Sequence, residues 1–406
     1  MKNLLIVVQH LDRGGAEKCA ANLSKLMEGK YNVHLVIFFS RDLFPVSYEY
    51  SGTLHCFEQQ LAKSPIHKIR NTIQRIRALR QLKKQHHIDV SVSYLFSGDM
   101  PNIFSKGKEK TVLALSNFLS ASETGLNKYL IQRFYNRADQ IVALNGRGRK
   151  DAIDNFNIKA AKTKTIPNFY DSADILQKYN EPVPEWSGTD DYFKFIQIGR
   201  FTHAKGQWHL LRIFRQVLDK QPKARLLIAG IGEMKEYLIE YAKRLHMSVQ
   251  DLGGTHDKTP DLTQHQIIFL GYTTNPFKYL RISDAFLFTS IYEGFPNALA
   301  EAMFCGMPVF STDCTTGPRE LIAPNENNIS NYPFQTAYGL LFPAFDGEQI
   351  DAEVPILEEE QLWIDTLQKY MDNTQLFGNI GENAQKRIQE FDKENVKRMW
   401  IETLNE

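Results

Sequence analysis

The stretch FKFIQIGRFTHAKGQWHLLRIFRQVLDKQPKARLLIAGIG, residues 193–232, decides the class of fold. Apolar runs at 193–200 and 224–232 have the length and composition of buried strands. Between them, the apolar residues of 206–221 recur at helical spacing. A strand, a helix and a second strand in this order form the unit from which parallel sheets are built. The stretch therefore predicts an α/β fold with helices on both faces of a parallel sheet.

The same alternation runs along most of the chain. Further strand-like runs lie at 4–8, 33–39, 111–115, 140–144, 267–271, 285–290 and 307–311. The pattern restarts after Pro167, so we predict two doubly wound units joined by the turn-rich segment 165–191. The predicted domains are 1–168 and 169–385, followed by a C-terminal helix, 386–406, that packs back on the first domain.

Composition narrows the class of protein. The chain has 406 residues, 43% of them apolar and 23% charged, as in a soluble globular protein of two domains. A net charge of +1 gives no reason to expect a nucleic-acid partner. The four cysteines form no CxxC pair, which argues against a disulfide framework or a zinc site. No apolar run approaches the roughly 20 residues of a spanning helix. We therefore expect a cytoplasmic protein that at most lies on a membrane.

Two glycines follow the first predicted strand. Gly14 and Gly15, in QHLDRGGAEK, separate that strand from a helix. Such a loop lets the backbone approach an anionic group at the start of the helix. A simple turn is the alternative.

Two cations follow a predicted strand that ends at Gly199. Arg200 and Lys205 lie in the loop IGRFTHAKGQ. In doubly wound sheets ligands bind beyond the carboxyl ends of strands, where an arginine and a lysine can hold a diphosphate. A solvated surface loop is the alternative.

Two glutamates lie in EGFPNALAEAM, residues 293–303. Pro296 is expected near the first helical position, which leaves the early amides pointing outwards as an anion site. Glu293, before the helix, can accept hydrogen bonds from ligand hydroxyls. Glu301, about two turns on, can accept them from a vicinal diol such as ribose. The alternative is one carboxylate that favours the helix start and one exposed helix residue. The amides in question are those of Phe295, Asn297 and Ala298.

Together these motifs resemble the retaining nucleotide-sugar glycosyltransferases of family 4, which have the GT-B fold. The segments that carry the resemblance are RGGAEK (13–18), GRFTHAKG (199–206), SDAFLFTSIYEGFPNALAEAMFCGMPV (283–309) and TTGPREL (315–321). Glu293 and Glu301 fit the E-x7-E signature of that family. The resemblance implies two Rossmann-like domains facing across a cleft, the first for the acceptor and the second for the nucleotide-sugar donor.

The resemblance also implies a role for each matching residue. Arg200 and Lys205 would neutralise the donor diphosphate. Glu293 would bind hydroxyls of the transferred sugar, and Glu301 would hold the ribose of the nucleotide. With Arg200 and Lys205, Glu293 forms the implied catalytic set. The loop of Gly14 and Gly15 would close on the donor. The remaining donor-binding positions are Gly294, Phe295, Asn297 and Ala298.

The activity implied by the resemblance is that of a retaining hexosyltransferase. The donor would be a nucleoside-diphosphate sugar, with a UDP-sugar favoured, and the acceptor a glycan or lipid-linked glycan in surface polysaccharide synthesis. Attack on the front face would need no covalent enzyme nucleophile. The chain contains no Asp-x-Asp pair, so we expect no metal and no other cofactor, with Arg200 and Lys205 facing the leaving group.

Other functions remain open on this fold. An epimerase or a phosphorylase is one alternative, although no cofactor lysine site of a phosphorylase is found. A protein that binds a sugar nucleotide without catalysis is the other, and the presence of Glu293, Arg200 and Lys205 argues against it. The chain departs from the family at Ser116 and Asn117, where many members carry a histidine. Ser116 can instead cap a turn.

The segment 61–88 contains eight lysines and arginines and no acidic residue. Its apolar residues at helical spacing predict an amphipathic helix whose apolar stripe packs on the first domain. The basic face would then contact an anionic membrane, chiefly through charge. A packed helix with a solvated basic face is the alternative. The predicted stripe consists of Ile69, Ile73, Ile76 and Leu79.

Overall fold

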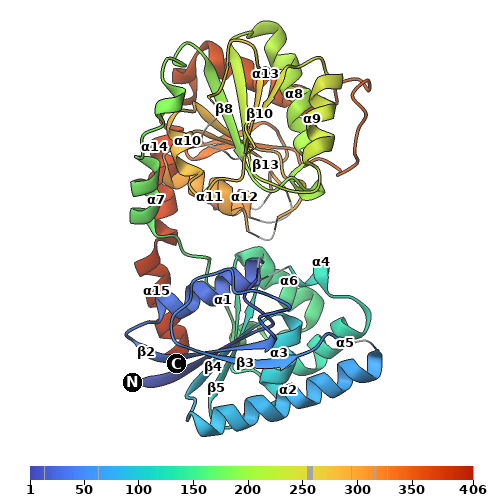
Figure 1. The fold of residues 1–406 in the computed structure, drawn as a ribbon, viewed down its shortest axis with the longest axis vertical. Coiled ribbons are helices and arrows are strands. Elements are labelled where there is room, and N and C mark those ends of the chain that lie inside the picture. The colour runs from blue at the N-terminus through green and yellow to red at the C-terminus, as the bar shows by residue number, and fades with distance from the viewer. Residues whose placement is uncertain are drawn as a thin grey trace. The chain divides into compact units, whose positions relative to one another are not determined.

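The computed structural model describes residues 1–12, 14–62, 64–116, 118–253, 259–293, 295–314, 317–326 and 328–405. The chain forms two compact units, Met1–Phe169 with Lys393–Glu406, and Tyr170–Asp392. Each unit is built on a mainly parallel sheet with helices on both faces (Figure 1). The predicted α/β class and the two doubly wound units are confirmed.

The first unit contains, within the described residues, a seven-stranded parallel sheet in the order β3-β2-β1-β4-β5-β6-β7. Strand order reverses between β1 and β4, which lie side by side. That junction is the switch point of this sheet. The strands are β1 (Lys2–Val8), β2 (Tyr31–Phe39), β3 (Thr53–Gln59), β4 (Val90–Tyr94), β5 (Lys110–Leu115), β6 (Gln140–Ala143) and β7 (Thr163–Thr165).

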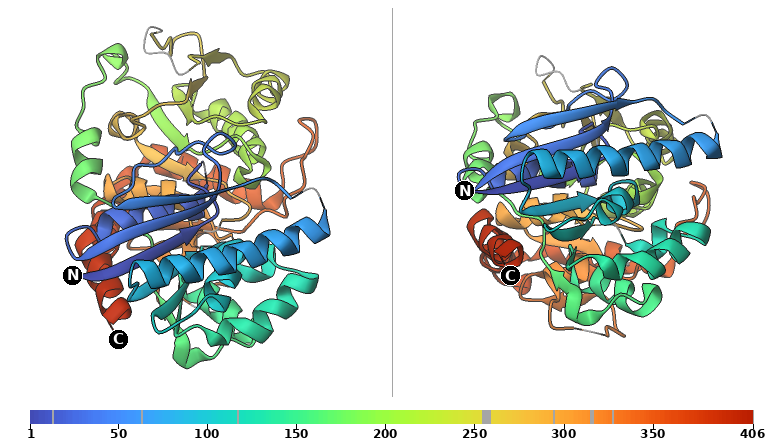
Figure 2. Two further views of the ribbon diagram at one scale, coloured as in Figure 1. Left: turned by 60° about the horizontal axis from the view of Figure 1, so that its bottom comes forward. Right: turned by 90° about the horizontal axis from the view of Figure 1, so that it is seen from below.

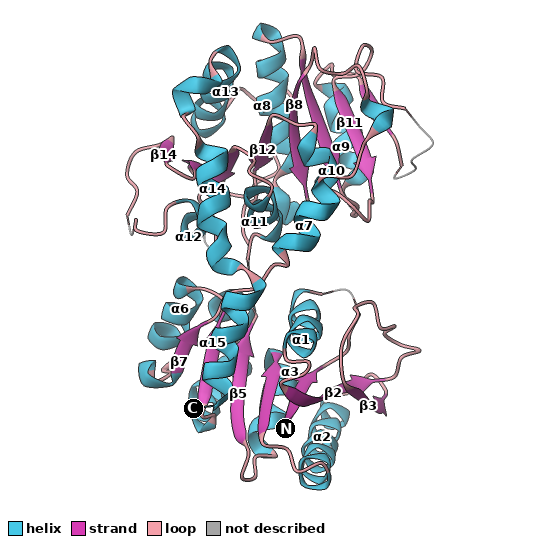
Figure 3. Ribbon diagram, turned by 90° about the vertical axis from the view of Figure 1, so that its left-hand side faces the viewer, coloured by secondary structure: helices cyan, strands magenta, loops and turns pink. Residues whose placement is uncertain are grey.

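Alternating side chains of this sheet build a core on each face. Leu4 and Ile6 of β1 pack with α1 (Gly15–Leu26) and α15 (Lys393–Asn405) on one face (Figure 3). Leu5 and Val7 pack on the other face, which α2 covers at this strand. The helices on that second face include α2 (Pro65–Gln85), α3 (Leu95–Phe104), α5 (Gly125–Phe134) and α6 (Gly146–Phe156); a short α4 (Leu119–Ser122) precedes α5.

The second unit contains, in the part of the chain that is described, an eight-stranded sheet in the order β10-β11-β9-β8-β12-β13-β15-β14. Only the edge strand β14 is antiparallel to its neighbour. The order reverses between β8 and β12, the switch point of this sheet. The strands are β8 (Phe193–Ile198), β9 (Ala224–Ala229), β10 (Val249–Asp251), β11 (Ile267–Gly271), β12 (Ala285–Phe288), β13 (Val309–Thr312), β14 (Phe334–Thr336) and β15 (Gly339–Phe342).

Eight helices of the second unit are described besides single 3-10 turns. They are α7 (Ser172–Tyr179), α8 (Gln207–Lys220), α9 (Lys235–Arg244), α10 (Phe277–Arg281), α11 (Asn297–Phe304), α12 (Pro318–Ile322), α13 (Glu358–Asp372) and α14 (Ile380–Ile388). No helix in the described part of the chain has both the length and the apolar character needed to cross a membrane.

Two details of the predicted domain organisation differ. The segment 165–191 is not a plain linker, because α7 lies within it and the units divide at Phe169 and Tyr170. The C-terminal segment 386–406 is also divided, since residues up to Asp392 belong to the second unit and only α15 belongs to the first. The chain passes from one unit to the other twice, at Phe169–Tyr170 and at Asp392–Lys393. The amide of Tyr170 donates to the Phe391 carbonyl at 3.1 Å, so the chain segments at these two passages run side by side.

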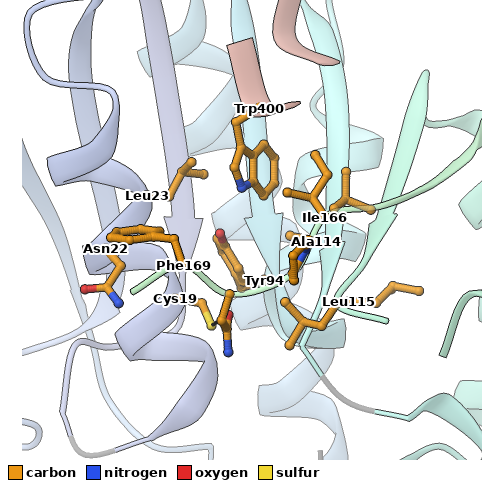
Figure 4. A pocket seen from close by; sticks show the side chains of 13 residues that line it. Cys19, Asn22, Leu23, Tyr94, Ala114, Leu115, Ile166, Phe169 and Trp400 are labelled. Atoms are coloured by element: carbon orange, nitrogen blue, oxygen red, sulfur yellow. Dashed lines mark hydrogen bonds between the residues drawn. The ribbon is translucent and has the colours of Figure 1, made fainter. Parts of the chain in front are cut away.

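A small cavity of about 30 Å³ lies in the first unit beside α1 and α15 (Figure 4). Tyr94, Cys19 and Trp400 line it, and the Cys19 thiol donates to the Asn168 side chain at 3.0 Å. Burial raises the pKa of the Cys19 thiol to about 12, so the thiol stays protonated. The volume suits a water molecule or two and is far too small for a sugar.

Candidate functional site

The predicted donor residues of the second unit lie at the switch point of its sheet. The loop after β8 carries Arg200 and Lys205, and the loop after β12 carries Glu293. Because β8 and β12 are parallel neighbours, these loops leave the same edge of the sheet. Ligands of doubly wound folds bind at this position.

Close backbone packing holds the 199–206 loop in place. Gly206 has a left-handed φ of +56°, and a Cβ there would lie 2.5 Å from the Thr289 carbonyl oxygen. The amide of Ile291 donates to the carbonyl of Ala204 at 2.9 Å. Only glycine combines this conformation with this approach. The loop after β8 is therefore fastened to the loop after β12.

This fastening brings Lys205 and Glu293 together. The Lys205 ammonium donates a hydrogen bond to Glu293 Oε1, forming an ion pair in which the two side chains are 21% and 9% exposed. The Ser290 hydroxyl donates to the same carboxylate oxygen at 2.7 Å. The Lys205 Nζ also lies 5.5 Å from the centroid of the Phe288 ring. We call Lys205, Glu293 and Ser290 the Lys205–Glu293 cluster.

Arg200 differs from Lys205 in its environment. Its side chain is exposed, and among the described residues its guanidinium has no hydrogen-bond or ion-pair partner. Its carbonyl oxygen, in contrast, accepts from the Thr202 amide and from Gln207 Nε2, both at 3.0 Å. The backbone of Arg200 is thus fixed while its five N–H donors remain accessible.

The start of α11 differs in part from the prediction. The helix begins at Asn297, and Pro296 precedes it as the N-cap. The amide of Asn297 donates to the Phe295 carbonyl at 2.9 Å and is not available to an anion. Ala298, in the first turn, has an amide without a hydrogen-bond partner in the described ranges. Phe295 is buried, and Gly294 lies outside the described residues.

Glu301 lies about one turn inside α11, closer to its start than the predicted two turns. It is half-buried, with buried apolar residues on both sides in the sequence. Burial, and next the charge of Glu301, raises the pKa of the neighbouring Cys305 thiol. A partly desolvated carboxylate of this kind is a good acceptor for ligand hydroxyls.

A second polar cluster, not predicted from the sequence, follows β13. Asp313 accepts hydrogen bonds from Arg319 Nε at 2.9 and 3.0 Å and from the Tyr332 hydroxyl at 2.6 Å. The hydrogen bond to Asp313 raises the pKa of Arg319, and burial raises that of Tyr332 to about 12. The cluster ties α12 to the end of β13, beside the loop of α11. The motif TTGPREL contained Arg319 but gave no sign of its partner.

Two exposed apolar residues at the same edge were also missed. Ile231 follows β9 and is 45% exposed, and Tyr272 follows β11 and is 61% exposed. Tyr272 directly follows the predicted strand 267–271, whereas Ile231 lies within the predicted strand 224–232 and was expected to be buried.

The two glycines of the first unit are arranged differently from the predicted anion site. Gly14 precedes α1, and the Glu17 carboxylate contacts the position that a Cβ of Gly14 would occupy. The Gly14 amide donates to the Tyr48 hydroxyl at 3.2 Å. A carboxylate of the chain itself therefore lies at this helix start, while a Cβ on Gly15 would meet nothing within 4 Å.

Ser116 follows β5, and its buried hydroxyl has no hydrogen-bond partner among the described residues. Within the described part of the chain it therefore caps no turn, which the alternative interpretation required. Asn117 lies outside the described residues.

Two doubly wound sheets, with polar side chains gathered at the switch point of the second, define the GT-B class of fold. Comparison with known proteins supports this class of fold. Residues 184–386 match the family described as glycosyl transferases group 1, and residues 13–174 match the model described as glycosyltransferase family 4. The chain belongs to the group 1 glycosyl transferases.

Two individual relatives are glycosyltransferases as well, and a solved structure shares the fold. An uncharacterised glycosyltransferase of Methanocaldococcus jannaschii is 33% identical over 83% of this chain and 83% of its own length. A Campylobacter jejuni N-acetylgalactosaminyltransferase, named for a diphospho-undecaprenol-linked substrate, is 26% identical over 80% of this chain and 85% of its own. Among solved structures, HepE of Anabaena in complex with UDP and glucose has a TM-score of 0.69 at 18% identity and covers all of both chains.

Proposed function

We propose that this glycosyltransferase moves a hexosyl unit from a nucleoside-diphosphate sugar, a UDP-sugar, to a glycan or lipid-linked glycan in surface polysaccharide synthesis. The transfer retains the configuration of the anomeric carbon and uses no metal. The observation that carries the proposal is the Lys205–Glu293 cluster at the switch point of the second sheet.

The cluster supports the proposal through its charges. Breaking a sugar–diphosphate bond places negative charge on the leaving phosphate, and preorganised cations stabilise that charge most when water is excluded. Lys205 is held in place by its ion pair, and Arg200 adds a planar fork that matches phosphate oxygens. When Lys205 turns to a diphosphate, the Glu293 carboxylate becomes an acceptor for sugar hydroxyls. Attack then occurs on the face that the leaving group departs from, with no covalent enzyme intermediate.

The nucleotide part of the donor is assigned to the neighbouring residues. Glu301 accepts from the ribose hydroxyls, and the Ala298 amide faces the phosphate. Ile231 and Tyr272 offer an apolar surface against which a nucleobase can stack. HepE of Anabaena, whose structure contains UDP, supports a uridine nucleotide. The Campylobacter jejuni relative supports a lipid-linked acceptor.

A panel of nucleotide sugars tests the proposal. One or more UDP-sugars should raise the melting temperature of the protein, because a ligand of the folded state stabilises it by mass action. Release of UDP from that donor should then persist in the presence of a chelator. Complete loss of activity with the chelator would contradict the metal-free scheme. Binding without any release of UDP, with or without acceptor glycans, would favour a non-catalytic sugar-nucleotide-binding protein.

A further inference from the structure

We propose that the first half of α2 docks on an anionic phospholipid bilayer and that its isoleucines enter the lipid interface. The proposal concerns a surface remote in sequence from the donor residues, and it needs no catalytic activity. It differs from the chiefly electrostatic contact that the sequence predicted.

The N-terminal turns of α2 present apolar side chains to solvent. Ile66 is 77% exposed, Ile69 is 63% exposed and Ile73 is 43% exposed. Their spacing of three and four residues places them on one face of the helix. Leu61, just before the helix, is 54% exposed. Three neighbouring exposed isoleucines are unlike the scattered apolar residues of an ordinary surface.

The opposite face of α2 packs on the sheet, and it is not the stripe that the sequence predicted. Leu79 is fully buried, but Ile69 and Ile73 lie outside that contact. Arg75 instead packs inwards, donating to Gln59 Oε1 at 2.8 Å with its guanidinium 4.4 Å from the centre of the Phe38 ring. Burial lowers the pKa of Arg75 to about 10. Ile69 and Ile73 of the predicted stripe are thus exposed, and the cation Arg75 is buried against the sheet in their stead.

Lys83 is also buried in the first unit. Its ammonium lies 2.8 Å from Glu109 Oε1 and donates to the side-chain oxygen of Asn102 at 2.7 Å. Arg75 and Lys83 therefore cannot contribute to a membrane contact, although both belong to the basic segment 61–88.

Three of the remaining cations of α2 share the face of the isoleucines, since Arg70 follows Ile66 by four residues. Arg70, Arg77 and Lys84 are exposed and are spaced by seven residues, as Ile66 and Ile73 are. Two helical turns separate residues seven apart, so both sets point outwards, the isoleucines near the start of α2 and the cations along its length. Figure 2 shows α2, in light blue, running along the outside of the first unit.

The charge of this face distinguishes between two possible binding partners, a second copy of the chain and an anionic membrane. The segment 61–88 has no acidic residue, so a second copy of the face would bring like charges together. An anionic lipid surface complements the cations and also accepts the isoleucines at the level of the headgroups. A bilayer that contains acidic phospholipid therefore fits both properties at once.

Co-sedimentation with vesicles of phosphatidylcholine and phosphatidylglycerol (7:3), without donor or acceptor, tests the proposal. The triple variant Ile66→Ser, Ile69→Ser, Ile73→Ser should lower the partition coefficient about 30-fold or more, because apolar burial is lost. The triple variant Arg70→Gln, Arg77→Gln, Lys84→Gln should lower it about 100-fold, or about fivefold for each cation. Wild-type binding should survive 0.5 M salt in part, since the apolar contribution is not screened. Leu376→Ser, at a leucine of the second unit that is 69% exposed, is the matched control and should bind as wild type.

A fluorescence measurement keeps the test independent of the folding of the triple variants. The four native tryptophans, Trp186, Trp208, Trp363 and Trp400, are all buried. A tryptophan introduced by Ile69→Trp should shift to shorter wavelength on addition of these vesicles, and one introduced by Leu376→Trp should not. Absence of wild-type binding at low salt would overturn the proposal, as would binding that the isoleucine variant leaves intact. A wild-type dimer that dissociates in the isoleucine variant would assign the face to self-association instead.

Discussion

Removing the ammonium of Lys205 should destabilise the second unit measurably, because Glu293 would lose its ion-pair partner. In Lys205→Met the aliphatic stem is kept, but the 9% exposed Glu293 side chain loses the ammonium that pairs with it. A fully buried broken pair costs about 3–5 kcal/mol. Because the Lys205 side chain is 21% exposed in the wild type, water can partly replace its ammonium beside Glu293 in the variant. We therefore expect the free energy of unfolding to fall by about 1–3 kcal/mol.

A thermal melt measures this loss. For a unit of this size the loss corresponds to a fall of roughly 2–10 °C in melting temperature. The double variant Lys205→Met, Glu293→Gln should recover part of the fall, because the carboxylate that lost the ammonium is then replaced by a neutral amide. A double-mutant cycle should therefore give a coupling free energy of about 1 kcal/mol or more. Arg200→Ala is the control and should melt as the wild type does, because its side chain is exposed. A zero coupling free energy between Lys205 and Glu293 would refute the ion pair as the organising contact of the site.

Three further predictions follow from the same structure. Calorimetry with UDP should show weaker binding in Glu301→Ala and nearly unchanged binding in Glu293→Ala; equal losses would contradict the division of ribose and sugar between them. Gly206→Ala should lower both the melting temperature and UDP affinity, because its Cβ would meet a backbone carbonyl, whereas Gly188→Ala, at φ +76° with nothing within 4 Å, should lose only about 1–2 kcal/mol of stability and no affinity. Burial raises the pKa of Asp99 to about 8, so the folded state binds one more proton than the unfolded state from about pH 4 to pH 8. Stability should fall as pH rises through this window in the wild type and fall less in Asp99→Asn; parallel melting curves against pH would count against a protonated Asp99.

The meeting of Lys205 and Glu293 could be anticipated from the sequence although they lie 88 positions apart. Each follows a short apolar run, and the carboxyl ends of parallel strands share one edge of a sheet. The pairing of these two charges with each other was not predictable. It depends on the approach of Gly206 to the loop after β12, a contact that no local pattern encodes.

Some features were predicted wrongly or not at all from the sequence, because they depend on the direction of side chains or involve short strands with polar residues. Helical spacing identified an apolar stripe in α2 but not which face meets the sheet, since Arg75 can pack its guanidinium over an aromatic ring. The glycines before α1 suggested an anion site without indicating that Glu17 would occupy it. Strands such as β4, VSVSY, escaped notice because serines alternate with the apolar residues of a strand that is buried on both faces.

Nuclear magnetic resonance of donor cleavage tests the central claim most directly. The wild-type protein is incubated with the UDP-sugar that raises its melting temperature most, and the nucleotide and the sugar are followed together. The account predicts that UDP appears, that the first sugar product keeps the anomeric configuration of the donor, and that Arg200→Ala lowers the rate about 10²–10³-fold. An inverted first product, or a rate that Arg200→Ala and Glu293→Ala leave unchanged, would contradict it.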